Sequence, residues 1–282
     1  MASSLSNRAL TVFKSVATLG REPQSFLGAA WIPAFLRRLP KNKQRKWALR
    51  ILALSPHYFL NREKPEFRNL PLDAYYEEEV KLGTASRNSI YENVLKPHLR
   101  ADDVVIDYGC GPGFVSKAMS PHVKKLYSCD ISTGALACAE IINSASNITY
   151  VKADEKGLST IPDSSIDVVV SFAVIQHLSD EIFSLVLENC RQKLKPGGRI
   201  VFQIQLTDDV WKTEAEHRDD GSLENQIKLK YGLHCFGRTA EAHIEKLEEH
   251  GFDNIQITHI ADANGNSFAG FSEGHLLTAI LA

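Results

Sequence analysis

A group of glycines flanked by acidic residues is the clearest chemical signal in this sequence of 282 residues. Asp107 is followed by Gly109, Gly111 and Gly113, and a second carboxylate, Asp130, comes later in the chain. Glycine adopts backbone angles that other residues avoid, and its missing side chain lets a ligand approach the main chain. An ionised carboxylate only accepts hydrogen bonds, so Asp130 suits the two hydroxyl groups of a ribose. These residues predict a site for a nucleoside-containing cofactor.

The glycines lie where a buried strand passes into a helix. Val104, Val105 and Ile106 form a continuous apolar run that is typical of a buried parallel strand, and a helix is expected from Gly113. Open α/β sheets bind ligands at the carboxyl ends of such strands. The alternation continues with strands expected at 125–129, 148–152, 166–171 and 199–205, and with helices expected at 132–142 and after Ser179. This order predicts a doubly wound parallel sheet.

The C-terminal part departs from this alternation. A helix is expected at 239–250, and strands at 254–260 and 275–281 follow with no helix between them, so they are expected to pair antiparallel. The predicted fold is therefore α/β: a Rossmann-like seven-stranded sheet, mostly parallel, with an antiparallel C-terminal hairpin and an N-terminal helical extension.

Residues 1–70 form a basic extension that differs from the rest of the chain. They carry 13 Lys and Arg residues against 3 Asp and Glu, whereas residues 71–282 carry 19 against 31. Three short amphipathic helices are expected in the extension. Two interpretations stay open: a helical cap that packs on the acidic domain, or peripheral contact with a membrane through residues 1–70. The acidic body disfavours nucleic acid as a partner.

We divide the chain into the extension, 1–70, and a domain, 71–282, in which the irregular polar segment at about 207–238 is expected to form a lid-like insertion. The five cysteines lack metal-ligand spacing. No apolar run reaches the roughly 20 residues that a helix needs to cross a bilayer, and the features of a secretory signal are missing. The expected location is cytoplasmic, peripheral to a membrane if the extension binds one.

Together these features resemble the class I S-adenosylmethionine-dependent methyltransferases, in particular the small-molecule branch that is methyltransferase type 11-like. The resemblance covers about residues 86–205 and includes the late turn Lys195-Pro196-Gly197-Gly198. It implies S-adenosyl-L-methionine as cofactor, with the three glycines bordering its methionine part. Asp107 would orient the amino group of the cofactor through water, and Asp130 would hold the ribose.

The resemblance also implies roles for residues at later strand ends. Asp154 would accept the adenine amino hydrogen, and Ser171 and Phe172 would line the pocket beneath the sulfonium. Two alternatives stay open. A non-catalytic S-adenosylmethionine-binding regulatory or scaffold protein would keep the same glycine loop. An NAD-dependent dehydrogenase is less favoured, because Phe114 stands where its third glycine is expected.

Methyl transfer from a sulfonium is an in-line displacement, so alignment of the acceptor matters most and a general base is optional. His177, after the fourth strand, is the candidate base for a hydroxyl acceptor, and its alternative role is to cap or pack the next helix. The fourth strand lacks the Asn/Asp-Pro-Pro-aromatic sequence of many enzymes that methylate nucleic-acid or protein amides and amines. The expected acceptor is a small organic or lipid-like molecule. Further candidates for its pocket are Tyr75, Tyr76, His217, Tyr231 and His234.

Overall fold

A seven-stranded sheet forms the centre of the structure, a computed structural model that describes residues 29–55, 58, 61–62, 64–153, 158–207, 222, 226, 235–260 and 274–282. The strand order is β3-β2-β1-β4-β5-β7-β6. The strands are β1 Val104–Tyr108, β2 Lys125–Asp130, β3 Ile148–Lys152, β4 Ile166–Ser171, β5 Leu194–Ile204, β6 Phe252–His259 and β7 His275–Leu281. Strands β1 to β5 pair in parallel, while β7 is antiparallel to both β5 and β6. The predicted fold class is therefore confirmed.

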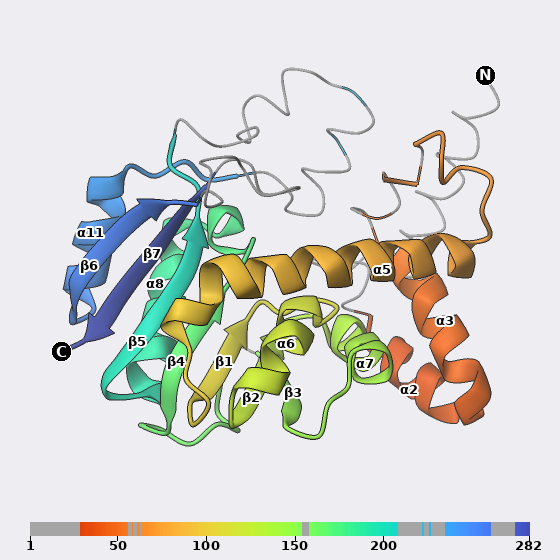
Figure 1. The fold of residues 1–282 in the computed structure, drawn as a ribbon, viewed down its shortest axis with the longest axis horizontal. Helices are drawn as coiled ribbons and strands as arrows, with labels where there is room; N and C mark the ends of the chain where they lie inside the picture. The colour runs from red at the N-terminus through yellow and green to blue at the C-terminus, as the bar shows by residue number, and fades with distance from the viewer. Residues whose placement is uncertain are drawn as a thin grey trace.

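Helices cover both faces of this sheet. They are α2 Trp31–Arg38, α3 Lys41–Ala53, α5 Leu72–Ile90, α6 Phe114–Met119, α7 Thr133–Ile142, α8 Asp180–Lys193 and α11 Ala240–Glu249. The described residues also form four short helical turns, namely η2 Tyr91–Leu95, η3 Lys96–His98, η4 Ser120–His122 and η5 Ile175–His177. Residues of α8 and α11 share one apolar cluster with the sheet, and residues of α6 and η2 share another. Figure 1 shows the resulting layers, with α5 reaching from the sheet past α6 to α3.

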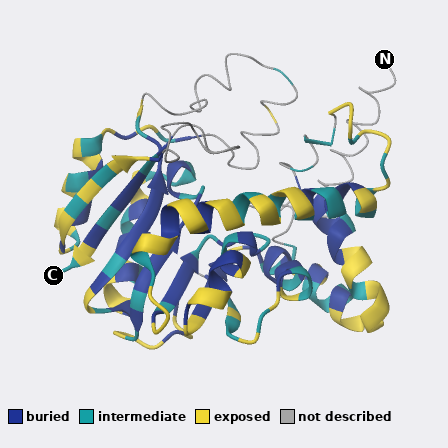
Figure 2. Cartoon of the chain, in the orientation of Figure 1, coloured by how far each residue is buried: buried dark blue, intermediate teal, exposed yellow. Residues whose placement is uncertain are grey.

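Burial follows the expected pattern of a doubly wound sheet. The central strand β4 is buried at five of its six positions, because helices cover both of its faces. The edge strand β6 is mostly exposed or half-buried. Figure 2 shows buried residues concentrated in the middle of the sheet and exposed ones on the outer helices. The carboxyl ends of β1, β2 and β4 thus meet on a rigid, well-packed support.

The first half of the long helix α5 was not predicted from the sequence. In the sequence, the apolar residues Ile90, Tyr91, Val94 and Leu95 predict a helix only from about Ser86, whereas α5 begins at Leu72 and a π-helical turn follows from Tyr91. Pro71 stands at the N-cap, where its fixed backbone angle suits a helix start. Gly83 lowers the local helix propensity, so tertiary packing stabilises this helix more than its own sequence does.

Strand β5 also starts earlier than the sequence suggested. The strand was expected at 199–205 after a turn at Lys195–Gly198, whereas β5 runs from Leu194 to Ile204. Its pairing with β4 shifts register between Ile166 and Val168, and Gly197 has a positive φ of 73°. The expected turn is therefore a bulge within the strand, where one partner carries extra residues.

The N-terminal helices share a core with α5 and α7. Side chains of α2, α3 and α5 form one buried cluster with Ala135 and Cys138 of α7. Tyr75 and Tyr76 are fully buried there, and the Tyr75 hydroxyl donates to the Tyr58 carbonyl at 2.6 Å. Part of the extension is therefore packed on the domain, with its basic side chains on the outside.

Candidate functional site

The glycine loop leaves β1 in an unusual backbone conformation. Gly109, Gly111 and Gly113 have φ angles of 80°, 50° and 80°, in the left-handed region that favours glycine. The N–H groups of Gly109 and Cys110 both donate to the Cys129 carbonyl, at 2.8 and 2.9 Å, which fixes the loop to the end of β2. Glycine is needed at these three positions, because any other residue would be strained at such angles.

Two of the glycines are also required by close neighbours. A Cβ at Gly109 would lie 2.4 Å from a methyl carbon of Val174, and one at Gly113 would lie 2.5 Å from the Tyr150 hydroxyl. Gly111 differs, because a Cβ there would meet no atom within 4 Å. The middle of the loop therefore faces open space, while its two ends are tightly packed.

Asp107 lies beneath this loop in a buried polar chain. The Ser116 hydroxyl donates to the Asp107 carboxylate at 2.5 Å, and the Ser128 hydroxyl donates to Ser116 at 2.7 Å. Burial raises the pKa of Asp107 to about 7, the bond from Ser116 opposes this rise, and the negative charge of Asp130 adds to it. The carboxyl group therefore changes its charge near neutral pH.

Asp130 ends β2 and holds the loop through its carboxylate. One oxygen accepts from the Gly111 N–H at 2.9 Å, and the other accepts from the Ser132 N–H at 2.8 Å. Burial raises the pKa of Asp130, and these two backbone bonds oppose the rise. Both oxygens retain a lone pair for a further donor. The Ser132 side chain caps α7 by accepting from the Ala135 N–H.

Ser171 is the last residue of β4, Phe172 follows it, and both are buried. The Ser171 hydroxyl donates to the Tyr108 carbonyl at 2.8 Å, which joins the ends of β4 and β1. Phe172 packs in the apolar cluster of α6 and η2. The next residue, Ala173, has a φ of 60°, and its N–H donates to the Gln203 side chain at 2.9 Å. The chain turns sharply here and leads to His177.

His177 is half-buried and lies beside residues that follow the segment 208–234. Its Nδ1 is 4.0 Å from the Cys235 sulfur, and that sulfur lies 3.6 Å from the Gln205 side-chain oxygen. The Phe236 N–H donates to the Gln176 carbonyl at 2.7 Å. Three separate parts of the chain therefore meet around this histidine at the carboxyl edge of the sheet.

Arg238 links the turn after β4 to the residues at both ends of the segment 208–234. Its guanidinium donates to Asp180 at 2.6 Å and to the carbonyls of Ile175 and Leu178, and it lies 5.2 Å from the Phe183 ring centre. Its own carbonyl accepts from the Thr207 N–H at 3.0 Å, so both ends of the segment at about 207–238 are tied together. The lid-like role of that segment stays a prediction, since nearly all of it lies outside the described residues.

Several sequence candidates lie apart from this edge or outside the description. Tyr75 and Tyr76 are core residues of the helical cluster, where burial raises the pKa of each hydroxyl. Four candidates lie outside the described residues, namely Asp154, His217, Tyr231 and His234. Among the residues described, no group of three or more His, Cys, Asp or Glu side chains is arranged for a metal ion. No helix in the described part of the chain is long and apolar enough to cross a bilayer.

Sequence reasoning missed the residues that support the loop from behind. Ser116 and Ser128 form the polar chain to Asp107, and the Asn143 side chain donates to the Pro112 carbonyl at 2.8 Å. The Tyr150 hydroxyl in turn donates to the Asn143 carbonyl at 3.1 Å. No local sequence signal marks these residues, because each one meets the loop only through the fold.

Comparisons with known proteins relate part of this chain to methyltransferases. Residues 106–202 match the model of a methyltransferase domain family. A ubiquinone biosynthesis O-methyltransferase from Pseudomonas fluorescens is 30% identical over 100 residues, which are 35% of this chain and 42% of the relative. The chain thus spans less than half the length of this curated relative.

Solved structures show the same fold. An S-adenosylmethionine-dependent methyltransferase from Mesorhizobium loti superposes with a TM-score of 0.50 at 21% identity, over 66% of this chain and 95% of the other. A phosphoethanolamine N-methyltransferase 2 from Haemonchus contortus also gives 0.50, at 17% identity, over 68% of this chain and 52% of the other. Residues 106–202 therefore match a methyltransferase domain, and the chain shares its fold with the S-adenosylmethionine-dependent methyltransferase from Mesorhizobium loti.

Proposed function

We propose that this protein transfers the methyl group of S-adenosyl-L-methionine to a small organic or lipid-like acceptor. The observation that carries the proposal is the open middle of the glycine loop, set between Asp107 and Asp130. A side chain at Gly111 would meet nothing within 4 Å, so the loop offers a cradle in which a ligand can lie against the main chain. The two carboxylates flank this cradle at the carboxyl edge of the sheet, where such folds bind ligands.

In this proposal the three glycines border the methionine part of the cofactor, Asp107 holds its amino group through water and Asp130 accepts the ribose hydroxyls. Ser171 and Phe172 close the wall beneath the reacting carbon. The bound cofactor supplies a methyl group that is already activated for displacement. The protein therefore has to align the acceptor and exclude water, and oriented reactants contribute about 7–11 kcal/mol at best.

His177 is proposed as the group that takes the proton of a hydroxyl acceptor. It is half-buried, and it lies on the turn that follows β4, the strand next to β1. Because the Cys235 thiol donates to the Gln205 side-chain oxygen, its sulfur is left as an acceptor toward Nδ1, so in this proposal Nδ1 carries the hydrogen and Nε2 accepts the proton. The relative from Pseudomonas fluorescens supports a hydroxyl acceptor, since its name describes O-methylation in ubiquinone biosynthesis.

The N-terminal helices support the lipid-like class of acceptor and a peripheral contact with a membrane. Trp31 and Trp47 are 46% and 37% exposed, and the Phe35 ring lies between them, with ring-centre distances of 6.1 and 5.3 Å. Arg50 stacks on the Trp47 ring at 5.3 Å. Exposed tryptophans beside cationic side chains suit the interface of an anionic membrane.

The test is to measure S-adenosylhomocysteine formation with two matched acceptors, a soluble phenol and a prenylated phenol in vesicles that contain phosphatidylglycerol. Turnover is expected, and faster turnover of the vesicle-borne acceptor would support the lipid-like class. Tight cofactor binding without turnover of any small or lipid-like acceptor would contradict the proposal and favour a non-catalytic binding protein.

Binding of S-adenosyl-L-methionine is expected to weaken as the pH falls from 7.0 to 5.5. Burial raises the pKa of Asp107 to about 7, so acid protonates the carboxylate that is proposed to hold the cationic amino group. Below that pKa the affinity should fall by at most about tenfold per pH unit, because one proton is taken up. Calorimetric titration across this range measures the effect.

The control for this pH dependence is Asp107→Asn, which keeps the side-chain shape without the titrating group. This variant should bind more weakly than the wild type at pH 7, with an affinity that varies little with pH. A wild-type affinity that is constant between pH 5.5 and 7.0 would show that Asp107 does not hold the amino group.

A further inference from the structure

The hairpin of α2 and α3 carries more cationic side chains than form ion pairs within the described residues. Between Trp31 and Ala53 there are seven Lys and Arg residues and no acidic residue. Three of these cations pair with α5, since Arg45 lies 2.6 Å from Glu77, and Lys46 and Arg50 lie 3.5 and 3.2 Å from Asp73. The other four cations have no ion pair within the described residues, namely Arg37, Arg38, Lys41 and Lys43.

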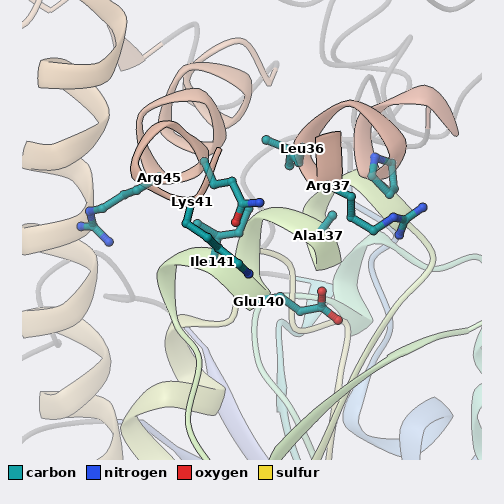
Figure 3. Close-up of a pocket in the computed structure, with 9 residues that line it drawn as sticks. Leu36, Arg37, Lys41, Arg45, Ala137, Glu140 and Ile141 are labelled. Atoms are coloured by element: carbon teal, nitrogen blue, oxygen red, sulfur yellow. The ribbon is translucent and has the colours of Figure 1, made fainter. Parts of the chain in front are cut away.

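Two of these four cations line a cavity of about 420 Å³ between the hairpin and α7. Arg37 comes from the last turn of α2 and Lys41 from the first turn of α3, and Figure 3 shows both beside Ala137 and Ile141 of α7. Arg45 also lines the cavity, although its guanidinium turns toward Glu77. The volume lies within the range of small-molecule sites.

The rest of the lining is mostly apolar. Pro33, Ala137 and Ile141 are half-buried apolar residues of the walls, Leu36 is almost fully buried, and Gln44 adds one uncharged polar side chain. Glu140 is the one acidic side chain in the lining, against three cations. A ligand that fits this combination has an anionic group for the cations and an apolar part for the walls.

We propose that this cavity binds the phosphate group of an anionic lipid. Arg37 and Lys41 hold the phosphate oxygens, with Arg45 as a third, shared cation, and the first carbons of the lipid contact Pro33 and Ile141. Arginine matches phosphate geometry through two parallel hydrogen bonds, and lysine adds a compact charge. This site lies on α7, outside the glycine loop, and goes beyond the proposed methyl transfer without depending on it.

The test is calorimetric titration of the full chain with two probes, inorganic phosphate and water-soluble dihexanoyl phosphatidic acid. The lipid probe is expected to bind at least tenfold more tightly than inorganic phosphate, because the apolar walls contact only the lipid. Equal affinity for both probes, or binding of inorganic phosphate alone, would overturn the lipid assignment.

Variants distinguish specific binding in the cavity from general electrostatic attraction to a basic surface. Arg37→Gln and Lys41→Gln should each weaken the lipid probe about tenfold, whereas Lys43→Gln, an exposed lysine of α3 outside the cavity, should leave it unchanged. Glu140→Gln should strengthen binding severalfold, because it removes the opposing charge. Equal losses in the Lys41 and Lys43 variants would overturn the site. Titration of S-adenosyl-L-methionine in the same variants should be unchanged, so this test is independent of methyl transfer.

Discussion

Asp130→Ala is expected to lower the affinity for S-adenosyl-L-methionine by about 10²- to 10⁴-fold. The carboxylate is proposed to accept both ribose hydroxyls, and hydrogen bonds to a charged group contribute about 1.5–3 kcal/mol each. The same carboxylate accepts the Gly111 and Ser132 N–H groups, so the variant also loosens the loop. Calorimetric titration measures the affinity, and thermal unfolding without ligand measures the loosening.

Two matched variants separate these roles. Asp102→Ala removes an exposed carboxylate from a turn and should change neither the affinity nor the stability. Asp130→Asn keeps one acceptor oxygen, so it should retain more of the loop than Asp130→Ala while still losing most of the affinity. A folded Asp130→Ala protein that binds with wild-type affinity would exclude Asp130 as the ribose ligand.

The sheet and the glycine loop could be predicted because their signals are local. Val104 to Ile106 is an apolar run that needs no distant partner to be recognised as a buried strand. The left-handed turn after it is visible because only glycine fits such angles without strain. The strand ends carrying Asp107 and Asp130 then follow from chain order in a parallel sheet.

The supporting contacts could not be predicted because they join distant parts of the chain. Ser116 reaches Asp107 only because α6 packs on β1, and Arg238 reaches Asp180 across 58 positions of sequence. The first half of α5 was missed for a related reason. Its buried residues Tyr75 and Tyr76 pack in one apolar cluster with residues of α2, α3 and α7, and this tertiary packing outweighs weak local propensity.

Gly109→Ala is expected to destabilise the protein by about 2–5 kcal/mol and to abolish cofactor binding. A left-handed conformation costs an L-residue about 1–2 kcal/mol, and overpacking adds about 1–3 kcal/mol. The new Cβ would lie 2.4 and 2.9 Å from the two methyl carbons of Val174. Gly111→Ala is the control, because it has the same backbone strain without a clash, so its cost should be about 1–2 kcal/mol.

A second substitution shows whether the clash causes this loss. Val174→Ala removes both methyl carbons that meet the new Cβ, so it should restore about 1–3 kcal/mol in the Gly109→Ala background while destabilising the wild type. A double-mutant cycle of unfolding free energies measures this coupling. Additive effects would mean that backbone strain alone makes Gly109 necessary. Strong coupling would mean that the turn after β4, which leads to His177, also fixes the position of the glycine loop. The proposed cofactor loop and the proposed base would then depend on each other for their positions.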